Sequence, residues 1–194
     1  TKVPNYAFYN CKSLKKIEFP EGLTEIGGRA FVRCTGITEI AFPESLTSIN
    51  GSSFSGCTGL KSITIPSGVT NISNSVFSGC TGLTTITLPE TLKTIDYYAF
   101  NGCTGLTSIK IPDSVTGISG YAFSNCTNLS SVDLPINWAT TYVSSSSYED
   151  YTPFDGCTKL TEITLPNGMT KVPNYAFYNC KSLKKIEFPE GLTE

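Results

Sequence analysis

The sequence predicts a solenoid of about eight coils, because three residue types recur at a fixed spacing. Cysteine, phenylalanine and proline each return every 23 residues, and a repeat of roughly 20 to 50 residues is typical of stacked coils. One interval, from Cys126 to Cys157, is 31 residues long. The cysteine column is Cys11, Cys34, Cys57, Cys80, Cys103, Cys126, Cys157 and Cys180. The phenylalanine column is Phe8, Phe31, Phe54, Phe77, Phe100, Phe123, Phe154 and Phe177, and the proline column is Pro20, Pro43, Pro66, Pro89, Pro112, Pro135, Pro166 and Pro189.

Each coil begins with a short strand, represented by residues 83–88 (Leu-Thr-Thr-Ile-Thr-Leu). Ile86 and Leu88 alternate with threonine, which predicts a strand with one buried face. Pro89 ends the strand, since proline cannot donate to a ladder. After a two-residue turn, residues 92–95 (Leu-Lys-Thr-Ile) predict a second extended piece on the opposite side of the coil.

Each coil closes with a turn that carries a small residue, the phenylalanine and the cysteine, as in residues 96–103 (Asp-Tyr-Tyr-Ala-Phe-Asn-Gly-Cys). This pattern predicts one helical or 3₁₀ turn ended by glycine. About eight of the 23 positions are expected to point inward, too few for one coil to close a core. Stacked coils would share a continuous core, with the phenylalanines as its spine.

The eight cysteines predict buried free thiols and not disulfides. Coils should stack like parallel strands, about 4.8 Å apart. Equivalent cysteines then point the same way, whereas a disulfide needs converging Cβ atoms about 3.8 Å apart. Each cysteine follows a phenylalanine by three residues at the entry to an apolar strand, where a thiol packs as a small hydrophobe.

Charges on neighbouring strands are expected to form complementary rows. The spacing places Lys16 beside Glu39, Lys110 beside Asp133, and Glu162 beside Lys185. Opposite charges in these positions favour one register of the coils. The one basic cluster, which contains Lys12, Lys15, Lys16 and Arg33, is interpreted as a solvated face.

Composition predicts no catalytic, cofactor or metal site. The chain has 194 residues, a net charge of −2 and no histidine, so it lacks the usual general base and metal ligand. No phosphate loop, dinucleotide fingerprint or zinc spacing occurs. The near-neutral, Ser- and Thr-rich composition gives no reason to expect nucleic acid as a partner. No apolar run reaches the roughly 20 residues that membrane insertion would need.

The repeated pattern Leu-x-x-Ile-x-Leu-Pro-x-x-Val-x-x-Ile-x-x-x-Ala-Phe-x-x-Cys resembles the BspA-like, or Treponema-type, leucine-rich repeat. Proline after the third apolar residue, and the missing asparagine of the standard repeat, mark this subclass. The resemblance covers the chain apart from the insertion at about 139–152. It implies a right-handed leucine-rich-repeat solenoid with a parallel sheet, in secreted or cell-surface proteins used for adhesion and protein–protein interaction. No catalytic residues come with this family.

The long coil contains a loop insertion at residues 139–152 with an unusual composition. Aromatic and serine-rich loops are typical of adaptable recognition surfaces. The candidate binding residues are Trp138, Tyr142, Tyr148, Glu149, Asp150 and Tyr151. Two interpretations remain open: a binding loop, or a tolerated surface bulge with Trp138 filling the core.

Residues 1–25 recur without a change as residues 170–194. The chain is therefore expected to form one solenoid domain over 1–194, with a higher-order unit of residues 1–169 that restarts at 170. Neither end resembles a polar cap, so we expect the chain to be a window of a longer array, with further copies stacked head to tail. The candidate stacking residues are Phe8, Cys11, Leu14, Ile17, Phe177, Cys180, Leu183 and Ile186.

The leading hypothesis for function is a non-enzymatic extracellular segment of a long surface stalk or filament. The alternative is a recognition module of a cell-surface adhesin, in which the sheet or the insertion binds a host protein or glycan. Both place the protein outside the cell or on its surface.

Overall fold

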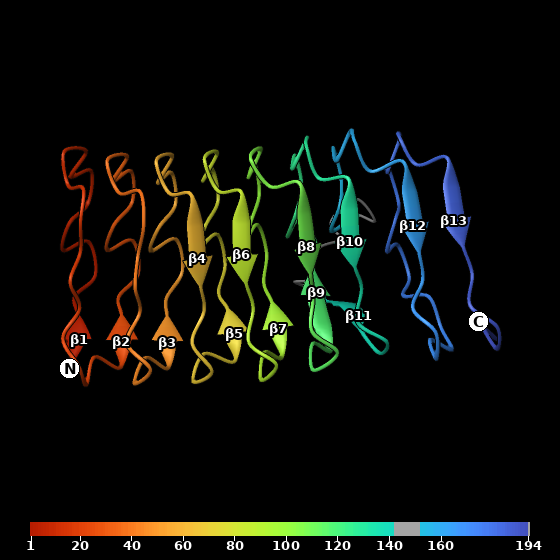
Figure 1. Ribbon diagram of the computed structural model, residues 1–194, viewed down its shortest axis with the longest axis horizontal. Coiled ribbons are helices and arrows are strands. Elements are labelled where there is room, and N and C mark those ends of the chain that lie inside the picture. The colour runs from red at the N-terminus through yellow and green to blue at the C-terminus, as the bar shows by residue number, and fades with distance from the viewer. Residues whose placement is uncertain (142–151, 194) are drawn as a thin grey trace.

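The computed structural model is a straight row of stacked coils, and it describes residues 1–141 and 152–193. The chain advances along one axis, from the N-terminus at one end of the row to the C-terminus at the other (Figure 1). We number the coils 1 to 8 by their cysteines, from Cys11 to Cys180. All regular elements of the described residues are short parallel strands. The predicted β-solenoid with a 23-residue coil is confirmed.

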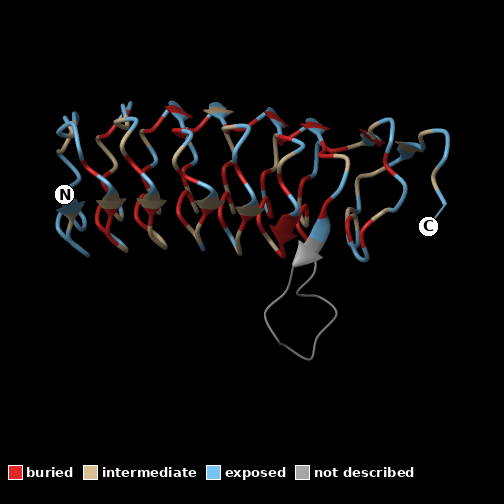
Figure 2. Ribbon diagram, turned by 90° about the horizontal axis from the view of Figure 1, so that it is seen from below, coloured by how far each residue is buried: buried red, intermediate tan, exposed pale blue. Residues whose placement is uncertain are grey.

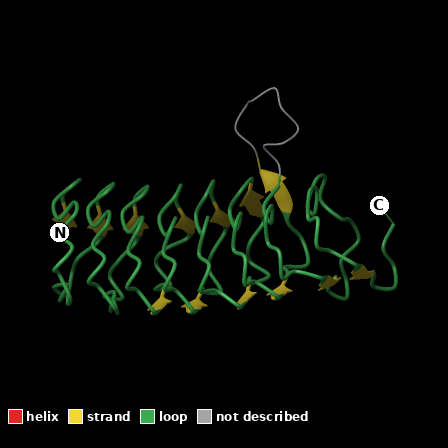
Figure 3. Cartoon of the chain, turned by 90° about the horizontal axis from the view of Figure 1, so that it is seen from above, coloured by secondary structure: helices red, strands yellow, loops and turns green. Residues whose placement is uncertain are grey.

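The strands form two rows on opposite sides of the stack (Figure 3). The first row, which follows each cysteine, comprises β4 (Ser62–Thr64), β6 (Thr85–Thr87), β8 (Ser108–Lys110), β10 (Ser131–Asp133), β12 (Glu162–Thr164) and β13 (Lys185–Glu187). The second row comprises β1 (Lys2–Val3), β2 (Glu25–Ile26), β3 (Ser48–Ile49), β5 (Asn71–Ile72), β7 (Thr94–Ile95), β9 (Gly117–Ser119) and β11 (Ala139–Thr141). Both rows were predicted from the two apolar pieces of each coil.

The register of the ladders follows the sequence period. Ile63 lies opposite Ile86, 23 residues later, and Ile72 lies opposite Ile95. Because a strand exposes alternate side chains, this register keeps Ile63 and Ile86 on the core side and the threonines of β4 and β6 outside. The paired groups are β1–β2–β3, β5–β7–β9–β11, β4–β6, β8–β10 and β12–β13.

Two of the three predicted charged pairs lie in the predicted register. Lys110 is opposite Asp133, and Glu162 is opposite Lys185. Lys185 Nζ nevertheless approaches Glu187 of its own strand, at 2.6 Å from Oε1. Residues two positions apart project from the same face, so Glu187 competes with Glu162 for the ammonium group. Exposed pairs of this kind add little stability.

The phenylalanine column is the spine of the core, as the sequence predicts. Its rings stack in order along the whole row, with centroids 5.0 Å apart for Phe8 and Phe31 and 6.1 Å apart for Phe154 and Phe177. Most members are completely buried, and burial is continuous through the interior of the row (Figure 2). Burying one such ring contributes about 2–3 kcal/mol, so the column outweighs the exposed ion pairs.

The closing turn differs from the predicted helical or 3₁₀ turn. Ala99 N–H donates to Asp96 O and Cys103 N–H donates to Phe100 O, while Tyr98 and Gly102 have φ of 56° and 69°. A positive φ at the third residue of a four-residue turn is the mark of a type II turn. A helix needs negative φ at consecutive residues, so the coil closes through successive β-turns instead.

These turns leave alternate amides free to join the coils. Phe77 N–H donates to Ala99 O and Gly79 N–H donates to Asn101 O, each in the following coil. Amides between them bond within their own turn, as Ser78 N–H does to Ser75 O. The closing turns of successive coils form one edge of the stack, which we call the turn edge. Hydrogen bonds between coils connect this edge, as they connect the two rows of strands.

The cysteines are free thiols, as predicted, and each interior thiol bonds to the coil before it. Cys57 Sγ donates to Phe31 O at 3.1 Å, and the same contact recurs from Cys34 to Cys180. Burial raises the pKa of Cys80 to about 12. The buried thiols are therefore neutral donors at physiological pH and suit packing rather than nucleophilic chemistry.

Candidate interaction surfaces

The predicted stacking residues lie at the two ends of the row, four at each end. Phe8 and Cys11 are exposed at the N-terminal end, and Phe177 and Cys180 are half-buried at the C-terminal end. Their equivalents in the middle of the row are fully buried. The remaining four, Leu14, Ile17, Leu183 and Ile186, are half-buried against the core. The structure groups them into two separate end faces.

An apolar hollow of about 350 Å³ opens at the N-terminal end. Its lining includes Val3, Phe8, Leu14, Ile17, Phe19 and Phe31. In every interior coil the preceding coil fills this space. The end face therefore has the shape and polarity of an interface between coils.

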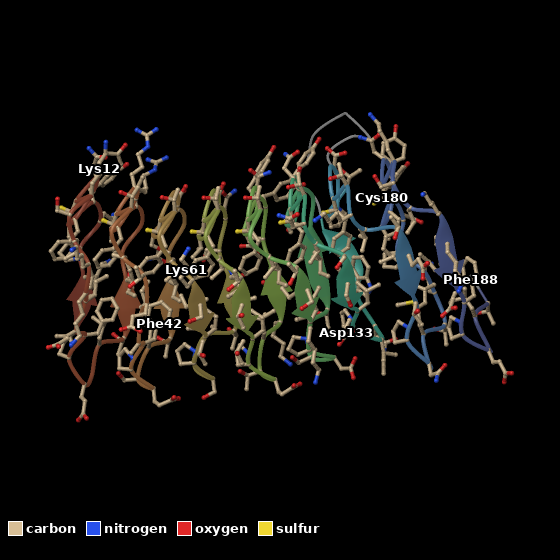
Figure 4. The ribbon with its side chains drawn as sticks, turned by 45° about the horizontal axis from the view of Figure 1, so that its top comes forward. Lys12, Phe42, Lys61, Asp133, Cys180 and Phe188 are labelled. Carbon is tan, nitrogen blue, oxygen red and sulfur yellow. The ribbon has the colours of Figure 1, made fainter. Side chains whose placement is uncertain are left out.

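The two identical 25-residue segments show what covers the C-terminal end face when a further coil follows. Phe19 packs against Phe31 and Phe42 of coil 2, with ring centroids 6.0 and 5.9 Å away. Phe188, the same residue of the second copy, is 64% exposed at the far end of the row (Figure 4). Because the sequences are identical, the difference comes only from the neighbouring coil.

Of the candidate loop residues, Trp138 alone lies among the described residues. Its side chain is 7% exposed and belongs to the core, and its indole Nε1 has no hydrogen-bond partner. This position agrees with the interpretation that Trp138 fills the core. Tyr142, Tyr148, Glu149, Asp150 and Tyr151 lie outside the described residues.

The turn edge carries a cleft that the sequence analysis did not identify. It has a volume of about 480 Å³ and continues into a second hollow of about 350 Å³ that reaches Asn74. Tyr6, Tyr9, Arg29, Val32, Ser52 and Ser55 line the larger part. We call this the turn-edge cleft.

The turn-edge cleft arises from a step in side-chain size along one column. In coils 1 to 6 the residues of this column, all with φ between 56° and 60°, are Tyr6, Arg29, Ser52, Ser75, Tyr98 and Tyr121. Two bulky residues are followed by two serines and then by two tyrosines, whose rings stack 5.2 Å apart. The signal was present in the sequence, but it becomes visible only when the coils are aligned by column and the column is known to face outward.

The described part of the chain shows neither a cluster of metal-ligating side chains nor a membrane-spanning helix. Residues 1–141 and 152–193 hold no group of three or more Cys, Asp or Glu side chains arranged around a common point. They also contain no helix that is long and apolar enough to cross a bilayer.

The fold and its repeat define a leucine-rich-repeat solenoid protein. The sequence pattern of the BspA type leucine-rich repeat region matches residues 1–130, 47–152 and 149–194, in six copies. The chain belongs to this family, as its resemblance predicted. No curated protein matches the sequence.

Solved structures of bacterial leucine-rich repeat proteins share the fold. A leucine-rich repeat protein from Bacteroides ovatus is 36% identical over 88% of this chain and 42% of its own, with a TM-score of 0.71. A leucine-rich cell surface protein from Faecalibacterium prausnitzii is 30% identical over 99% of this chain and 61% of its own, with a TM-score of 0.64. A leucine-rich repeat protein from T. pallidum is 28% identical over 79% and 64% of the two chains, with a TM-score of 0.58. This chain spans less than two thirds of each.

Proposed function

We propose that the chain is a non-enzymatic segment of a stalk at the cell surface, in which the coils continue head to tail. The observation that carries this proposal is the identity of residues 1–25 and 170–194. Coil 2 packs against one face of the first copy, where it contacts Phe19, and the second copy presents the same face with Phe188 exposed. A coil with the sequence of residues 26–48 fits that face.

The contacts between coils 1 and 2 show what such a continuation would form. Phe8 N–H donates to Ala30 O at 2.8 Å, and Cys34 Sγ donates to Phe8 O at 3.0 Å. The rings of Phe8 and Phe31 stack at 5.0 Å. Each contact has an equivalent site in the second copy, at Phe177. The seam between two units would then be as strong as any other junction.

Charges on the strands favour one way of joining further copies of the chain over another. If one 194-residue copy simply sat on another, coil 8 would meet coil 1, and Lys185 would face Lys16. Like charges on neighbouring strands repel, whereas a coil resembling coil 2 would bring the equivalent of Glu39 beside Lys185. This register favours units that continue as one chain, or an arrangement in which residues 170–194 of one copy replace residues 1–25 of the next.

The proposed location at the cell surface is supported by the F. prausnitzii neighbour, which is described as a cell surface protein.

A chain of two units, residues 1–169 written twice and followed by residues 1–25, tests the stalk. Small-angle scattering and electron microscopy should show one straight rod of nearly twice the length. Two rods joined by a bend at the seam would contradict the proposal. A parent protein with a single unit would also contradict it.

The second candidate is a recognition module of an adhesin, and the turn-edge cleft favours it. Tyr6, Tyr9 and Arg29 are exposed residues of types that are enriched at binding sites. A panel of host proteins and glycans tests this candidate directly. If the two-unit rod forms and nothing on the panel binds, the stalk alone remains.

A further inference from the structure

The turn-edge cleft has positive charge without a counterion. Arg29 and Arg33 are both exposed on this edge, and neither forms an ion pair with a carboxylate of the described residues. Lys12 lies on the same edge of the stack (Figure 4). The cleft lining of tyrosine, serine, asparagine and valine contributes no negative charge. The local charge therefore favours an anionic ligand.

The guanidinium group of Arg29 is held in place before any ligand arrives. Its Nη1 donates a hydrogen bond to Tyr6 Oη, and its Cζ lies 5.6 Å from the centroid of the Tyr6 ring. This bond uses one of the five N–H donors of the guanidinium group, so the group can still bind a carboxylate through two parallel hydrogen bonds. A group that is already ordered loses less entropy on binding.

The backbone of the cleft floor is not free to bind a peptide strand. Ser52 N–H donates to Asn74 O and Gly56 N–H donates to Ser78 O in the next coil. Ser53 N–H and Ser55 N–H bond within their own turns. Pairing an extended peptide with an edge requires unpaired main-chain groups. Recognition in this cleft therefore depends on side chains.

The side chains that remain suit a sugar. Tyr6 and Tyr9 present tilted ring faces, with centroids 6.0 Å apart, against which the apolar face of a pyranose ring can lie. The hydroxyl group of Ser52 and the amide N–H groups of Asn74 can bond to sugar hydroxyls, and the hydroxyl group of Ser55, which donates to Ser78 O, can still accept a bond. The volume lies within the roughly 300–1,000 Å³ of known ligand sites.

We propose that the turn-edge cleft binds an acidic saccharide, with the carboxylate of a uronic acid on Arg29 and a sugar ring on Tyr6 or Tyr9. This site goes beyond the stalk and gives the adhesin candidate a specific ligand class. It does not depend on the head-to-tail stacking of further units, because every lining residue belongs to coils 1 to 4 of this chain. If the two-unit chain did not form a straight rod, the proposal of a saccharide site would be unaffected.

The experiment titrates the full chain with trigalacturonic acid by isothermal calorimetry, and compares the neutral trisaccharide galactotriose and the peptide Glu-Glu-Glu. The variants are Arg29→Ser and Tyr6→Ser, because serine already occupies this column at Ser52 and Ser75 with the same φ. The matched control is Tyr98→Ser, in the same column but outside the cleft. Circular dichroism and thermal unfolding report whether each variant folds.

We expect trigalacturonic acid to bind at least tenfold more tightly than galactotriose. We also expect Arg29→Ser and Tyr6→Ser each to weaken binding by tenfold or more, with Tyr98→Ser unchanged. Three results would overturn the proposal: no binding of trigalacturonic acid, equal weakening by Tyr98→Ser, or equally tight binding of Glu-Glu-Glu, which would indicate a surface for acidic peptides. A variant that does not fold is replaced by Arg29→Gln or Tyr6→Asn under the same criteria.

Discussion

The thiol of Cys103 donates a hydrogen bond to the backbone carbonyl oxygen of Phe77, 3.2 Å away in the preceding coil. The same carbonyl accepts the amide of Cys80. The cysteine therefore forms a hydrogen bond between adjacent coils, and not a disulfide. Its geometry explains why cysteine, and not alanine, keeps the 23-residue period.

Cys103→Ala should lower the free energy of unfolding by about 1–3 kcal/mol, through the lost hydrogen bond and a small cavity. Cys11→Ala removes an exposed thiol with no preceding coil and should stay within about 0.5 kcal/mol of the parent. Urea unfolding measures both. Equal effects of the two substitutions would show that the thiol bond to Phe77 contributes nothing.

Stability should fall as the pH rises above about 9. Burial raises the pKa of Cys80 to about 12, above its value of about 8.5 in an unfolded chain. The raised pKa stabilises the fold fully below the unfolded value, and this contribution is lost as the pH rises toward the folded value. Between pH 9 and 12 the parent should lose about 1.4 kcal/mol per pH unit relative to Cys80→Ser, which does not titrate. Urea unfolding at pH 8 and pH 10.5 measures the difference, and a constant difference would refute this origin.

Replacing serine by glycine should have opposite effects at two positions. Ser52 has φ of 60°, a conformation that costs an ordinary residue roughly 1 kcal/mol, so Ser52→Gly should be neutral or stabilising by up to about 1 kcal/mol. Ser108 lies in β8 and is exposed, and there glycine should destabilise by about 0.5–1 kcal/mol. Thermal unfolding compares the two. Destabilisation of the same size at both positions would contradict the proposed role of the left-handed turn.

Gly82→Ala should destabilise the stack by about 3 kcal/mol or more, because a Cβ at this position would lie 2.3 Å from Thr58 O in the preceding coil. Gly191→Ala is the control. A Cβ there meets nothing within 4 Å, and the only cost is its φ of 86°, about 1 kcal/mol. Similar losses for both variants in urea unfolding would mean that the coils can separate to admit a methyl group.

Much of the fold could be predicted from the period. The columns of Cys57, Phe77 and Pro89 predicted the number of coils, the parallel register and the free thiols, because equivalent residues in a stack must occupy equivalent places. The members of the two end faces could also be predicted, because they occupy the column positions of coils 1 and 8. The closing turn could not: an Ala-Phe pair before Asn-Gly suits a helical turn as well as a chain of β-turns.

The sequence by itself determined the identity of the two 25-residue copies, and with it the 169-residue spacing between them. Only the tertiary structure showed that Phe19 is covered by coil 2 while Phe188 is open, and that Lys185 pairs with Glu187 of its own strand. It alone brought Tyr6 and Arg29 together above a floor of serines. A repeat determines which residues are equivalent, but the side chains of adjacent coils determine what lies on the surface, and those contacts exist only once the coils are stacked.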